Sequence, residues 1–428
     1  MATDSSAGLD PELARLDATV PPSVREVCQR LGEAGHQAVT VGGAVRDAML
    51  DRSPGDWDVA TSAHPDAVMQ LFRGTLPTGI EHGTVTVRIG RGGQRDPIEV
   101  TTFRGEGAYS DARRPDQVVF GVSLEEDLAR RDFVVNAMAW DPIGRALFDP
   151  FGGRADLAAR RLRAVGVAAE RFAEDGLRIV RAVRFVASLD FGLEESTEAA
   201  IPGALGSLAR VSRERVRVEL VKLLAGPAAG RALDIAERTG ILLQVLPELA
   251  GKDVAAAIAR VGGVPREAGV GMAALMLEVP APAVDAALRR LTYSNVERAR
   301  VTGLVAEAAA LRGVPAWVAE LMAAEDDPPD GVHLRRALGR VGRPAVADLA
   351  ALVGDPATAA QLQKIAAAGD PLSIGDLALG GADVMRVLGV PPGPAIGRAL
   401  AELLARVLED PSLNTREALE RMLRAATR

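Results

Sequence analysis

The sequence predicts an α+β protein: an N-terminal head with a mixed sheet and helices, followed by a long remainder built of helices alone. Helix and strand patterns alternate over residues 1–160, which is typical of an α/β or α+β head. From about Ala168 onward the strand patterns stop, and Ala, Leu, Arg and Glu recur at helical spacing.

The elements of the head follow in order from their residue patterns. Helices are predicted over 24–34, 44–50 and 65–72, and strands over 36–41, 57–60, 84–89 and 98–103. Pro65 suits the start of the third helix, because its missing N–H costs little there. The last two strands alternate apolar and polar residues, as half-buried strands do. Glycine and proline clusters at 226–227, 262–265, 326–329 and 391–394 are expected to break the helical remainder.

Composition narrows the class of protein. The chain has 428 residues and a net charge of −7, which argues against non-specific binding of duplex DNA but leaves a local RNA-binding face possible. Its single cysteine, Cys28, excludes an internal disulfide and a cysteine metal cluster. None of the four histidines is followed by Asp, which argues against a zinc site or a phosphohydrolase built on a His-Asp pair. No stretch reads as a signal peptide or a membrane span, so we expect a soluble cytoplasmic protein with no membrane partner.

Two aspartates, Asp56 and Asp58, mark the start of the second predicted strand. Side chains two apart on a strand face the same side, so we expect both carboxylates on one face. Such a pair can hold Mg²⁺ and so serve chemistry on a nucleoside triphosphate. Glu99, on a later strand, is the candidate third carboxylate of this catalytic site. The alternatives are turn or strand-edge residues for the aspartates and an ordinary exposed strand residue for Glu99.

A glycine pair, Gly42 and Gly43, precedes the aspartates. Glycines let backbone amides approach a phosphate, because no Cβ blocks the way. Arg46 lies one turn into the following helix and can reach phosphate from there, and a helix N-terminus favours anions. The alternative is a simple turn from strand to helix.

A second basic segment runs from Arg130 to Ala137. In it Arg131 is a candidate to bind a triphosphate, and Asp132 could accept a hydrogen bond from a ribose hydroxyl, which would favour ribonucleotides. Asn136 would brace that loop. The alternative is a solvated helix cap.

A third segment, residues 174–184, carries Asp175, Arg178, Arg181 and Arg184 at steps of three residues. On a helix Asp175 and Arg178 are neighbours, but each further step slips round the axis, so the four side chains are not expected to point at one spot. Cytosine and adenine both present an amine donor beside a ring-nitrogen acceptor, whereas uracil and guanine reverse the two groups. One Asp–Arg pair could therefore accept C and A and reject U and G. The alternative is a salt-bridged helix face.

The three segments, in this order, resemble the class II CCA-adding tRNA nucleotidyltransferases and the related bacterial poly(A) polymerases. The resemblance is dense over residues 38–225 and includes Asp149-Pro150-Phe151-Gly152-Gly153 and the Arg213-Glu214-Arg215 helix. It implies a polymerase-β-like head over 1–166, a neck with the nucleotide-selecting helix over 167–226, a helical body over 227–325 and a helical, tRNA-binding tail over 326–428. It implies Asp56 and Asp58 as metal ligands, and nucleotide contacts from Gly43, Arg46, Arg131, Asp175, Arg178, Arg181 and Arg184.

The activity that the resemblance implies is Mg²⁺-dependent addition of CMP, CMP and AMP from CTP and ATP to the 3′ end of tRNA, with release of pyrophosphate. No obligate protein partner is evident. Residues 78–85 look like the CCA-type segment, and residues 105–115 look like the flexible loop that enzymes adding the final A retain. An A-adding enzyme or a poly(A) polymerase remains the close alternative. A catalytically inactive RNA-binding protein is the alternative from another class.

Overall fold

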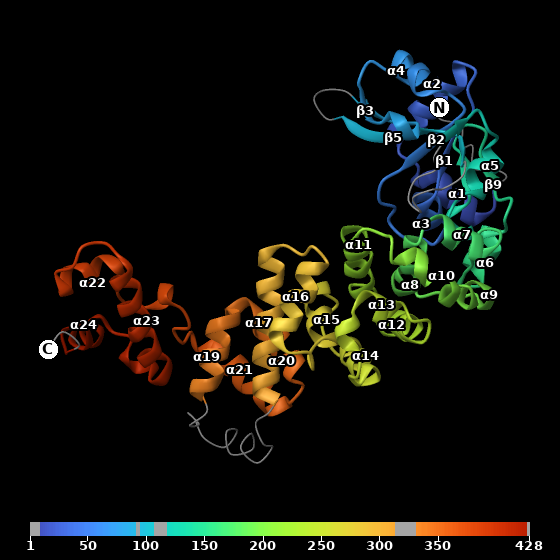
Figure 1. Cartoon of the computed structure of the whole chain (residues 1–428). Helices are drawn as coiled ribbons and strands as arrows, with labels where there is room; N and C mark the ends of the chain where they lie inside the picture. Colours follow the sequence, from blue (N-terminus) through green and yellow to red (C-terminus); the bar gives the residue numbers. More distant parts are fainter. Residues whose placement is uncertain (1–8, 91–94, 107–117, 313–330, 426–428) are drawn as a thin grey trace. The chain divides into compact units, whose positions relative to one another are not determined.

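The computed structural model describes residues 9–90, 95–106, 118–312 and 331–425 (Figure 1). The chain divides into two compact units. Unit 1 comprises the residues up to Leu220 together with Ile235–Val245, and unit 2 comprises Val221–Asp234 and the residues from Leu246 on. The finer division into head, neck, body and tail stays a prediction. Of the expected flexible loop, 105–115, residues 107–115 lie outside the described residues.

Unit 1 begins with the mixed α and β elements. They are α1 (Pro11–Thr19), α2 (Pro22–Glu33), β1 (Ala38–Val41), α3 (Gly43–Met49), β2 (Asp58–Thr61), α4 (Pro65–Leu71), β3 (Thr75–Gly79), β4 (Thr84–Ile89), β5 (Asp96–Thr102), β6 (Arg104–Glu106), β7 (Val118–Phe120), α5 (Leu124–Ala129), β8 (Ala139–Asp141), β9 (Ala146–Phe148), α6 (Gly153–Ala158) and β10 (Arg161–Leu162). A 3-10 turn, η2 (Val134–Asn136), lies between α5 and β8.

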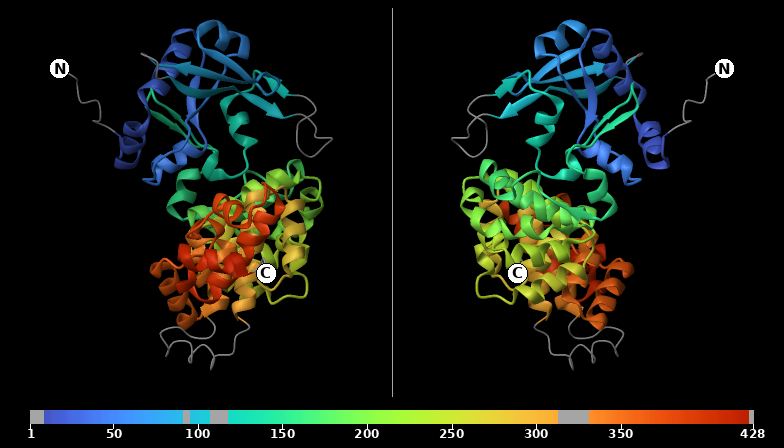
Figure 2. Two further views of the ribbon diagram at one scale, coloured as in Figure 1. Left: turned by 90° about the vertical axis from the view of Figure 1, so that its left-hand side faces the viewer. Right: turned by 90° about the vertical axis from the view of Figure 1, so that its right-hand side faces the viewer.

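Seven strands form one sheet in the order β3-β4-β5-β2-β1-β8-β9. The pair β2 and β5 is parallel and the other neighbours are antiparallel, so the sheet is mixed, as predicted. Helices α2 and α4 pack against the sheet, α2 on β1 and β2 and α4 on β4 and β5 (Figures 1 and 2). The α+β class predicted from the sequence is confirmed.

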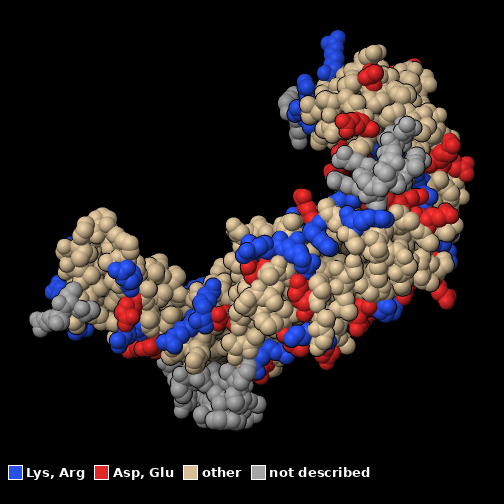
Figure 3. Space-filling model, in the orientation of Figure 1, with Lys and Arg blue, Asp and Glu red and all other residues tan. Residues whose placement is uncertain are grey.

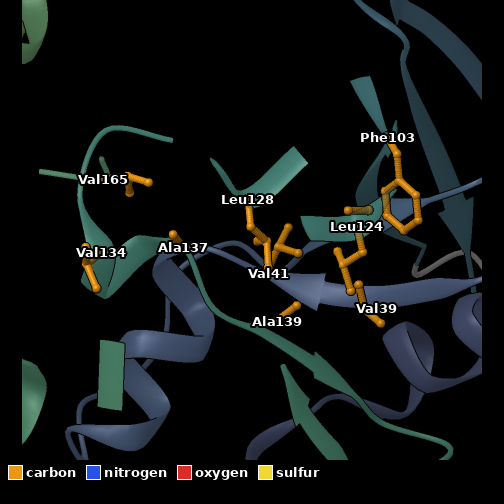
Figure 4. Close-up of a cluster of buried hydrophobic side chains, with 10 residues drawn as sticks. Val39, Val41, Phe103, Leu124, Leu128, Val134, Ala137, Ala139 and Val165 are labelled. Carbon is orange, nitrogen blue, oxygen red and sulfur yellow. The ribbon is translucent and has the colours of Figure 1, made fainter. Parts of the chain in front are cut away.

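A hydrophobic cluster joins the sheet to the segment that follows α5. Val39 and Val41 of β1 pack with Leu124 and Leu128 of α5, and Val134 of η2 belongs to the same buried cluster (Figure 4). These contacts remove apolar side chains from water and fix α5 over the end of β1. The residues that follow α5 are thereby held next to the turn that follows β1.

The remaining elements of unit 1 are helical apart from one short strand. They are α7 (Ala168–Glu174), α8 (Leu177–Leu189), β11 (Gly192–Leu193), α9 (Glu195–Ala199), α10 (Ile201–Leu208), α11 (Arg213–Leu224), α12 (Ala229–Arg238) and α13 (Ile241–Val245), and α11 and α12 cross the boundary between the units. The break between α7 and α8 falls at Asp175 and Gly176. A Cβ on Gly176 would lie 2.3 Å from the backbone carbon of Ser207, so only glycine allows α10 to come this close.

Unit 2 is built of helices among its described residues. These are α14 (Val254–Gly262), α15 (Ala268–Leu275), α16 (Ala281–Arg290), α17 (Asn295–Arg312), α19 (Gly331–Val341), α20 (Val346–Val353), α21 (Pro356–Ala368), α22 (Gly381–Leu388), α23 (Pro394–Glu409) and α24 (Arg416–Ala425). Leu400, Leu403 and Val407 of α23 form a local core with Leu419 and Leu423 of α24. Over the described ranges, every helix is too short or too polar to serve as a membrane span.

Candidate functional site

A cleft of about 530 Å³ in unit 1 collects most of the residues that the sequence singled out. Its lining comprises Gly42, Gly43, Arg46, Asp58, Arg130, Arg131, Asp132, Asn136, Asp175, Leu177, Arg178, Arg181, Arg184, Phe185 and Arg215. Ten of the twelve predicted site residues are among them, while Asp56 and Glu99 are not. Seven arginines and three aspartates give the cleft a strongly positive lining. The volume suits a small-molecule ligand, and the charge suits an anion.

Asp58 enters the cleft because of strand pairing. It is the first residue of β2 and pairs with Val41, the last residue of β1, so its carboxylate lies beside the glycine turn. Burial, then the negative charge of Glu99 and that of Asp56, raise the pKa of Asp58 to about 6, against an opposing effect of the Arg131 guanidinium. Negative charge is therefore concentrated at this end of the sheet.

The other two carboxylates lie near Asp58 but outside the cleft. Glu99 is exposed on β5, one position before the Val59–Val100 pair, which makes it the strand neighbour of Asp58. Asp56 is exposed in the loop before β2. The prediction that both aspartates lie on the strand is wrong for Asp56, because β2 starts at Asp58 and Asp56 lies two residues before it in the loop.

Whether these residues fit a metal ion follows from their chemistry. Among the described residues, no group of three or more His, Cys, Asp or Glu side chains is arranged to hold a metal ion. Mg²⁺ typically takes only one or two carboxylates from the protein and completes its shell with water and substrate phosphate oxygens. The carboxylates of Asp56 and Asp58 match that need, and their mutual repulsion would be relieved by a cation. The pair therefore fits Mg²⁺.

The two glycines differ in their local geometry. Gly42 has φ +77° and ψ −133°, a conformation that is essentially restricted to glycine. A Cβ on Gly42 would also lie 2.9 Å from Nη1 of Arg131. Gly43 is the first residue of α3, and a Cβ there would meet its nearest neighbour, Nη2 of Arg46, at an ordinary 3.6 Å. The close packing of Arg131 against the turn thus depends on Gly42.

Arg46 and Asn136 link the first two segments. Arg46 Nη1 donates to Oδ1 of Asn136 at 2.5 Å, and the same guanidinium pairs with Asp47 at 2.8 Å. Asn136 Nδ2 in turn donates to Oδ1 of Asp132 at 3.1 Å. Asn136 therefore braces the loop as predicted, and it also fixes the arginine of α3.

Asp132 links the loop to α8. Its Oδ1 also accepts from the backbone N–H of Phe133 at 2.8 Å. Its Oδ2 accepts from Nε of Arg181 at 2.8 Å and lies 2.6 Å from Nη2 of the same guanidinium, with which it forms an ion pair. Burial would raise the pKa of Asp132, but the positive charge of Arg181 and the bond from Asn136 outweigh it and lower the pKa to about 2. A buried carboxylate of this kind stays ionised and fixes the guanidinium against it.

Glu219 and Phe185 complete the arrangement of the α8 arginines. Glu219, buried on α11, accepts from Arg184 Nε at 2.8 Å and lies 3.5 Å from Arg181 Nη1. The guanidinium carbons of Arg184, Arg46 and Arg181 lie 3.5, 5.2 and 5.2 Å from the ring centroid of Phe185, within the range of cation–π attraction. Helical slippage was expected to keep the α8 arginines apart, but Arg178, Arg181 and Arg184 all line the cleft.

Asp175 lies at the break between α7 and α8 rather than on one helix with Arg178, contrary to the prediction. Its Oδ1 accepts from the N–H of Leu177 at 2.9 Å, and its Oδ2 accepts from Nη2 of Arg215 at 2.6 Å. Arg178 pairs with Glu174 and donates to the carbonyl of Arg130 at 2.8 Å. The Asp–Arg pair thus shares one cleft, but each member is held by a different partner.

The site prediction left out several side chains, among them Arg215, Glu219 and Asp127, as well as Arg130, Leu177 and Phe185 of the cleft lining. Asp127, almost fully buried on α5, accepts from Arg130 at 3.0 Å and Arg131 at 3.4 Å. Arg215 belongs to the Arg213-Glu214-Arg215 motif, and that motif was the available signal for it. Asp127 lies three and four positions before Arg130 and Arg131, and this helical spacing was the available signal for it. Glu219 carries no local signal, because its partners lie on α8.

Comparison with protein families supports a common origin for this site. The sequence model described as the Poly A polymerase head domain matches residues 38–163, and the one described as a probable RNA and SrmB-binding site of polymerase A matches residues 190–252. A CCA-adding enzyme of Geobacillus stearothermophilus is 50% identical over 227 residues, 53% of this chain and 55% of that enzyme. The chain thus spans about half the length of this relative. A CCA-adding enzyme of Lactobacillus delbrueckii subsp. bulgaricus is 36% identical over 400 residues, 93% of this chain and 96% of that enzyme.

Solved structures agree with this relationship. The crystal structure of the Bacillus stearothermophilus CCA-adding enzyme in complex with CTP superposes with a TM-score of 0.70 and 33% identity, covering 98% of both chains. A Thermotoga maritima CCA-adding enzyme complexed with tRNA shares the fold with a TM-score of 0.63 and 21% identity. From the match along nearly its whole length to the Lactobacillus enzyme, the chain belongs to the CCA-adding enzymes, a family of nucleotidyltransferases.

Proposed function

We propose that this chain adds CMP, CMP and AMP in turn to the 3′ end of tRNA, using CTP and ATP and releasing pyrophosphate. The observation that carries the proposal is the single cleft in which Asp58 faces the arginines of three separate segments. The near full-length similarity to a CCA-adding enzyme supports it.

The triphosphate would bind on the arginine side of the cleft. Arg46 and Arg131 border the glycine turn, where the N-terminus of α3 adds partial positive charge. Each guanidinium is held by a carboxylate behind it, Arg46 by Asp47 and Arg131 by Asp127. The site is therefore shaped before the nucleotide arrives, which lowers the cost of ordering it on binding.

Base selection would depend on Asp175 and Arg178. Among its hydrogen bonds, Asp175 Oδ2 accepts from Arg215 and keeps acceptor capacity for the exocyclic amine of C or A. Arg178 would donate to the ring nitrogen beside that amine. The carbonyl of U or G in place of the amine would face the carboxylate and be repelled, which supports selection of C and A.

The sugar would lie near Asp132, although a direct contact has a cost. Three hydrogen bonds and an ion-pair contact with Nη2 of Arg181 already occupy the Asp132 carboxylate. A ribose hydroxyl would therefore bind Asp132 only by replacing one of these donors. We infer that Asp132 acts at least in part by holding Arg181 and Asn136 in place.

Mg²⁺ is the proposed cofactor, held by Asp56 and Asp58 with Glu99 as the candidate third carboxylate. When bound, it would lower the pKa of the attacking 3′ hydroxyl and neutralise the leaving pyrophosphate. The residues of the chain would orient the triphosphate and the base, and no dedicated protein base is proposed for the hydroxyl. The cytoplasm, where tRNA and nucleoside triphosphates meet, is the proposed compartment.

The test is incorporation of each labelled nucleoside triphosphate into three tRNA transcripts, ending before CCA, after the first C and after the second C. We expect CMP on the first two transcripts, AMP on the third, no UMP or GMP, and loss of all incorporation with EDTA. AMP alone, on the third transcript, would indicate an A-adding enzyme, and long A tails a poly(A) polymerase. RNA binding without incorporation under any condition would indicate an inactive RNA-binding protein.

A further inference from the structure

A second pocket of about 480 Å³ lies in unit 1 at the end of the sheet where β3, β4 and β5 meet α2 and α4. Four arginines line it, namely Arg30, Arg73, Arg88 and Arg95, whereas Glu26 is its one acidic residue. Figure 3 shows Lys and Arg side chains gathered at this tip of the sheet. None of these residues belongs to the nucleotide cleft.

Backbone pairing brings three of the arginines together. The N–H of Arg88 donates to the carbonyl of Gly74 at 2.6 Å, which places Arg73 beside the end of β4. A Cβ on Gly74 would lie 2.9 Å from the carbonyl oxygen of Arg88 and 3.6 Å from Nη1 of Arg95, so this glycine allows the close approach. Arg95 directly precedes β5, whose Asp96 pairs with Ile89 of β4.

The fourth arginine is fixed in place. Arg30 stacks on the ring of Phe72, with its guanidinium carbon 4.5 Å from the ring centroid, and donates to the carbonyl of Leu71 at 2.6 Å. Its nearest acidic partner, Glu26, is 3.9 Å away. On one side of the pocket, the Arg30 guanidinium is therefore already held in place by the Phe72 ring before any ligand binds.

The charge of the pocket is not neutralised internally. Arg73, Arg88 and Arg95 are exposed, and no ion pair joins them to any acidic side chain among the described residues. Gathering like charges is unfavourable unless an anion is bound or the charges block an exposed sheet edge. Because β3 is an edge strand, protection of the sheet edge by these charges is the alternative that the experiment has to exclude.

We propose that this pocket binds phosphate groups of the RNA substrate's backbone; the inference rests on the proposed function. Two observations favour a polyanion over a single free phosphate: the pocket is large, and its four arginines come from four segments of the chain. In addition, Arg88 shares a sheet face with Glu99, since Thr86 pairs with Glu99 and Arg88 with Pro97. Glu99 is in turn the strand neighbour of Asp58. A strand of RNA ending at Asp58 can therefore continue along this face.

The test measures the affinity of a fluorescent tRNA transcript lacking CCA as a function of salt. Each lost contact to a single-stranded or duplex phosphate lowers the salt slope by about 0.7 to 0.9 and, at 0.1 M salt, the affinity by about five- to eightfold. We expect this change for Arg73→Gln and for Arg88→Gln, and about 25- to 60-fold for the double variant. Lysine at both positions should restore most of the affinity.

Arg160→Gln is the matched control, because Arg160 is exposed on unit 1, lies outside the pocket and loses the same charge. It should change the affinity less than twofold. The proposal is overturned if the double variant binds RNA like the parent. If that variant also aggregates, the arginines protect the sheet edge. If it instead raises KM for CTP, the pocket binds a free phosphorylated ligand. Failure of the proposed function would appear separately, as absence of CMP incorporation by the parent.

Discussion

Replacing Gly42 by alanine tests whether the geometry of the glycine turn controls the nucleotide site. At φ +77° and ψ −133°, a side chain costs about 1–3 kcal/mol in backbone strain. In addition, the new methyl group would lie 2.9 Å from Nη1 of Arg131, closer than ordinary van der Waals contact. Arg131 would have to retreat by about half an ångström, because its flexible end yields before the backbone does.

Two other glycines separate these effects. Gly35 has φ +86° with open space around its Cβ position, so Gly35→Ala carries the backbone strain alone. Gly43 has no positive φ and would make only an ordinary 3.6 Å contact with Arg46. Gly43→Ala should therefore preserve the free energy of unfolding. Any loss of activity in this variant would indicate that the new methyl group occupies space that a bound phosphate needs.

The assay combines urea unfolding with initial rates of CMP incorporation. We expect Gly42→Ala and Gly35→Ala to lose similar stability, about 1–3 kcal/mol, while Gly42→Ala alone loses about tenfold in kcat/KM for CTP. The tenfold figure follows from the displacement, since errors of about 1 Å at a site can cost about 100-fold. Equal kcat/KM for the two variants would refute the role assigned to the contact between Gly42 and Arg131.

Three further predictions address the carboxylates. Asp58→Asn should lower the rate of nucleotide incorporation by at least about 1000-fold, while its tRNA affinity, measured by fluorescence, stays within twofold of the parent. Full activity of the parent protein without added Mg²⁺ would contradict the metal assignment. Asp175→Ala should reduce discrimination between CTP and UTP by at least about tenfold in competition assays, and unchanged selection would refute its role as a base acceptor. Asp132 has its pKa lowered to about 2 from the ordinary 3.8, so it stabilises the folded protein above about pH 4 and this contribution is lost as the pH falls toward 2. In urea unfolding between pH 5 and pH 3, Asp132→Asn should be less stable at pH 5 and should lose less stability on acidification, whereas parallel curves would be inconsistent with the pairing to Arg181.

Local patterns were sufficient for four of the seven strands of the sheet and for the position of Asp58, whereas β3, β8 and β9 were not predicted. The predicted strand over 84–89 coincides with β4, and the predicted helix over 65–72 ends one residue beyond α4. These elements are set by period and by proline position, both of which act within a few residues. The position of Asp58 was predicted for the same reason, because a short apolar run in the local sequence is enough to predict β2.

The details of base selection depended on contacts far apart in the chain. The helix was expected to run through Asp175, yet it breaks there, where Asp175 is extended and the next residue, Gly176, packs against the backbone of Ser207. The partner of Asp175 proved to be Arg215, forty positions later. No pattern within a segment could report either contact, because both arise only when α10 and α11 pack beside α8.

The carboxylates behind the arginines have a consequence for repeated catalysis. A free arginine side chain carries about 2 kcal/mol of rotamer entropy, and those held by Asp127, Asp132 and Glu219 have surrendered much of it during folding. If the cleft accepts CTP twice and ATP once per tRNA, each incoming nucleotide meets the same rigid cationic wall. The entropy of ordering these arginine side chains is then lost once, when the protein folds. Successive rounds of addition can differ in the base without ordering these side chains again.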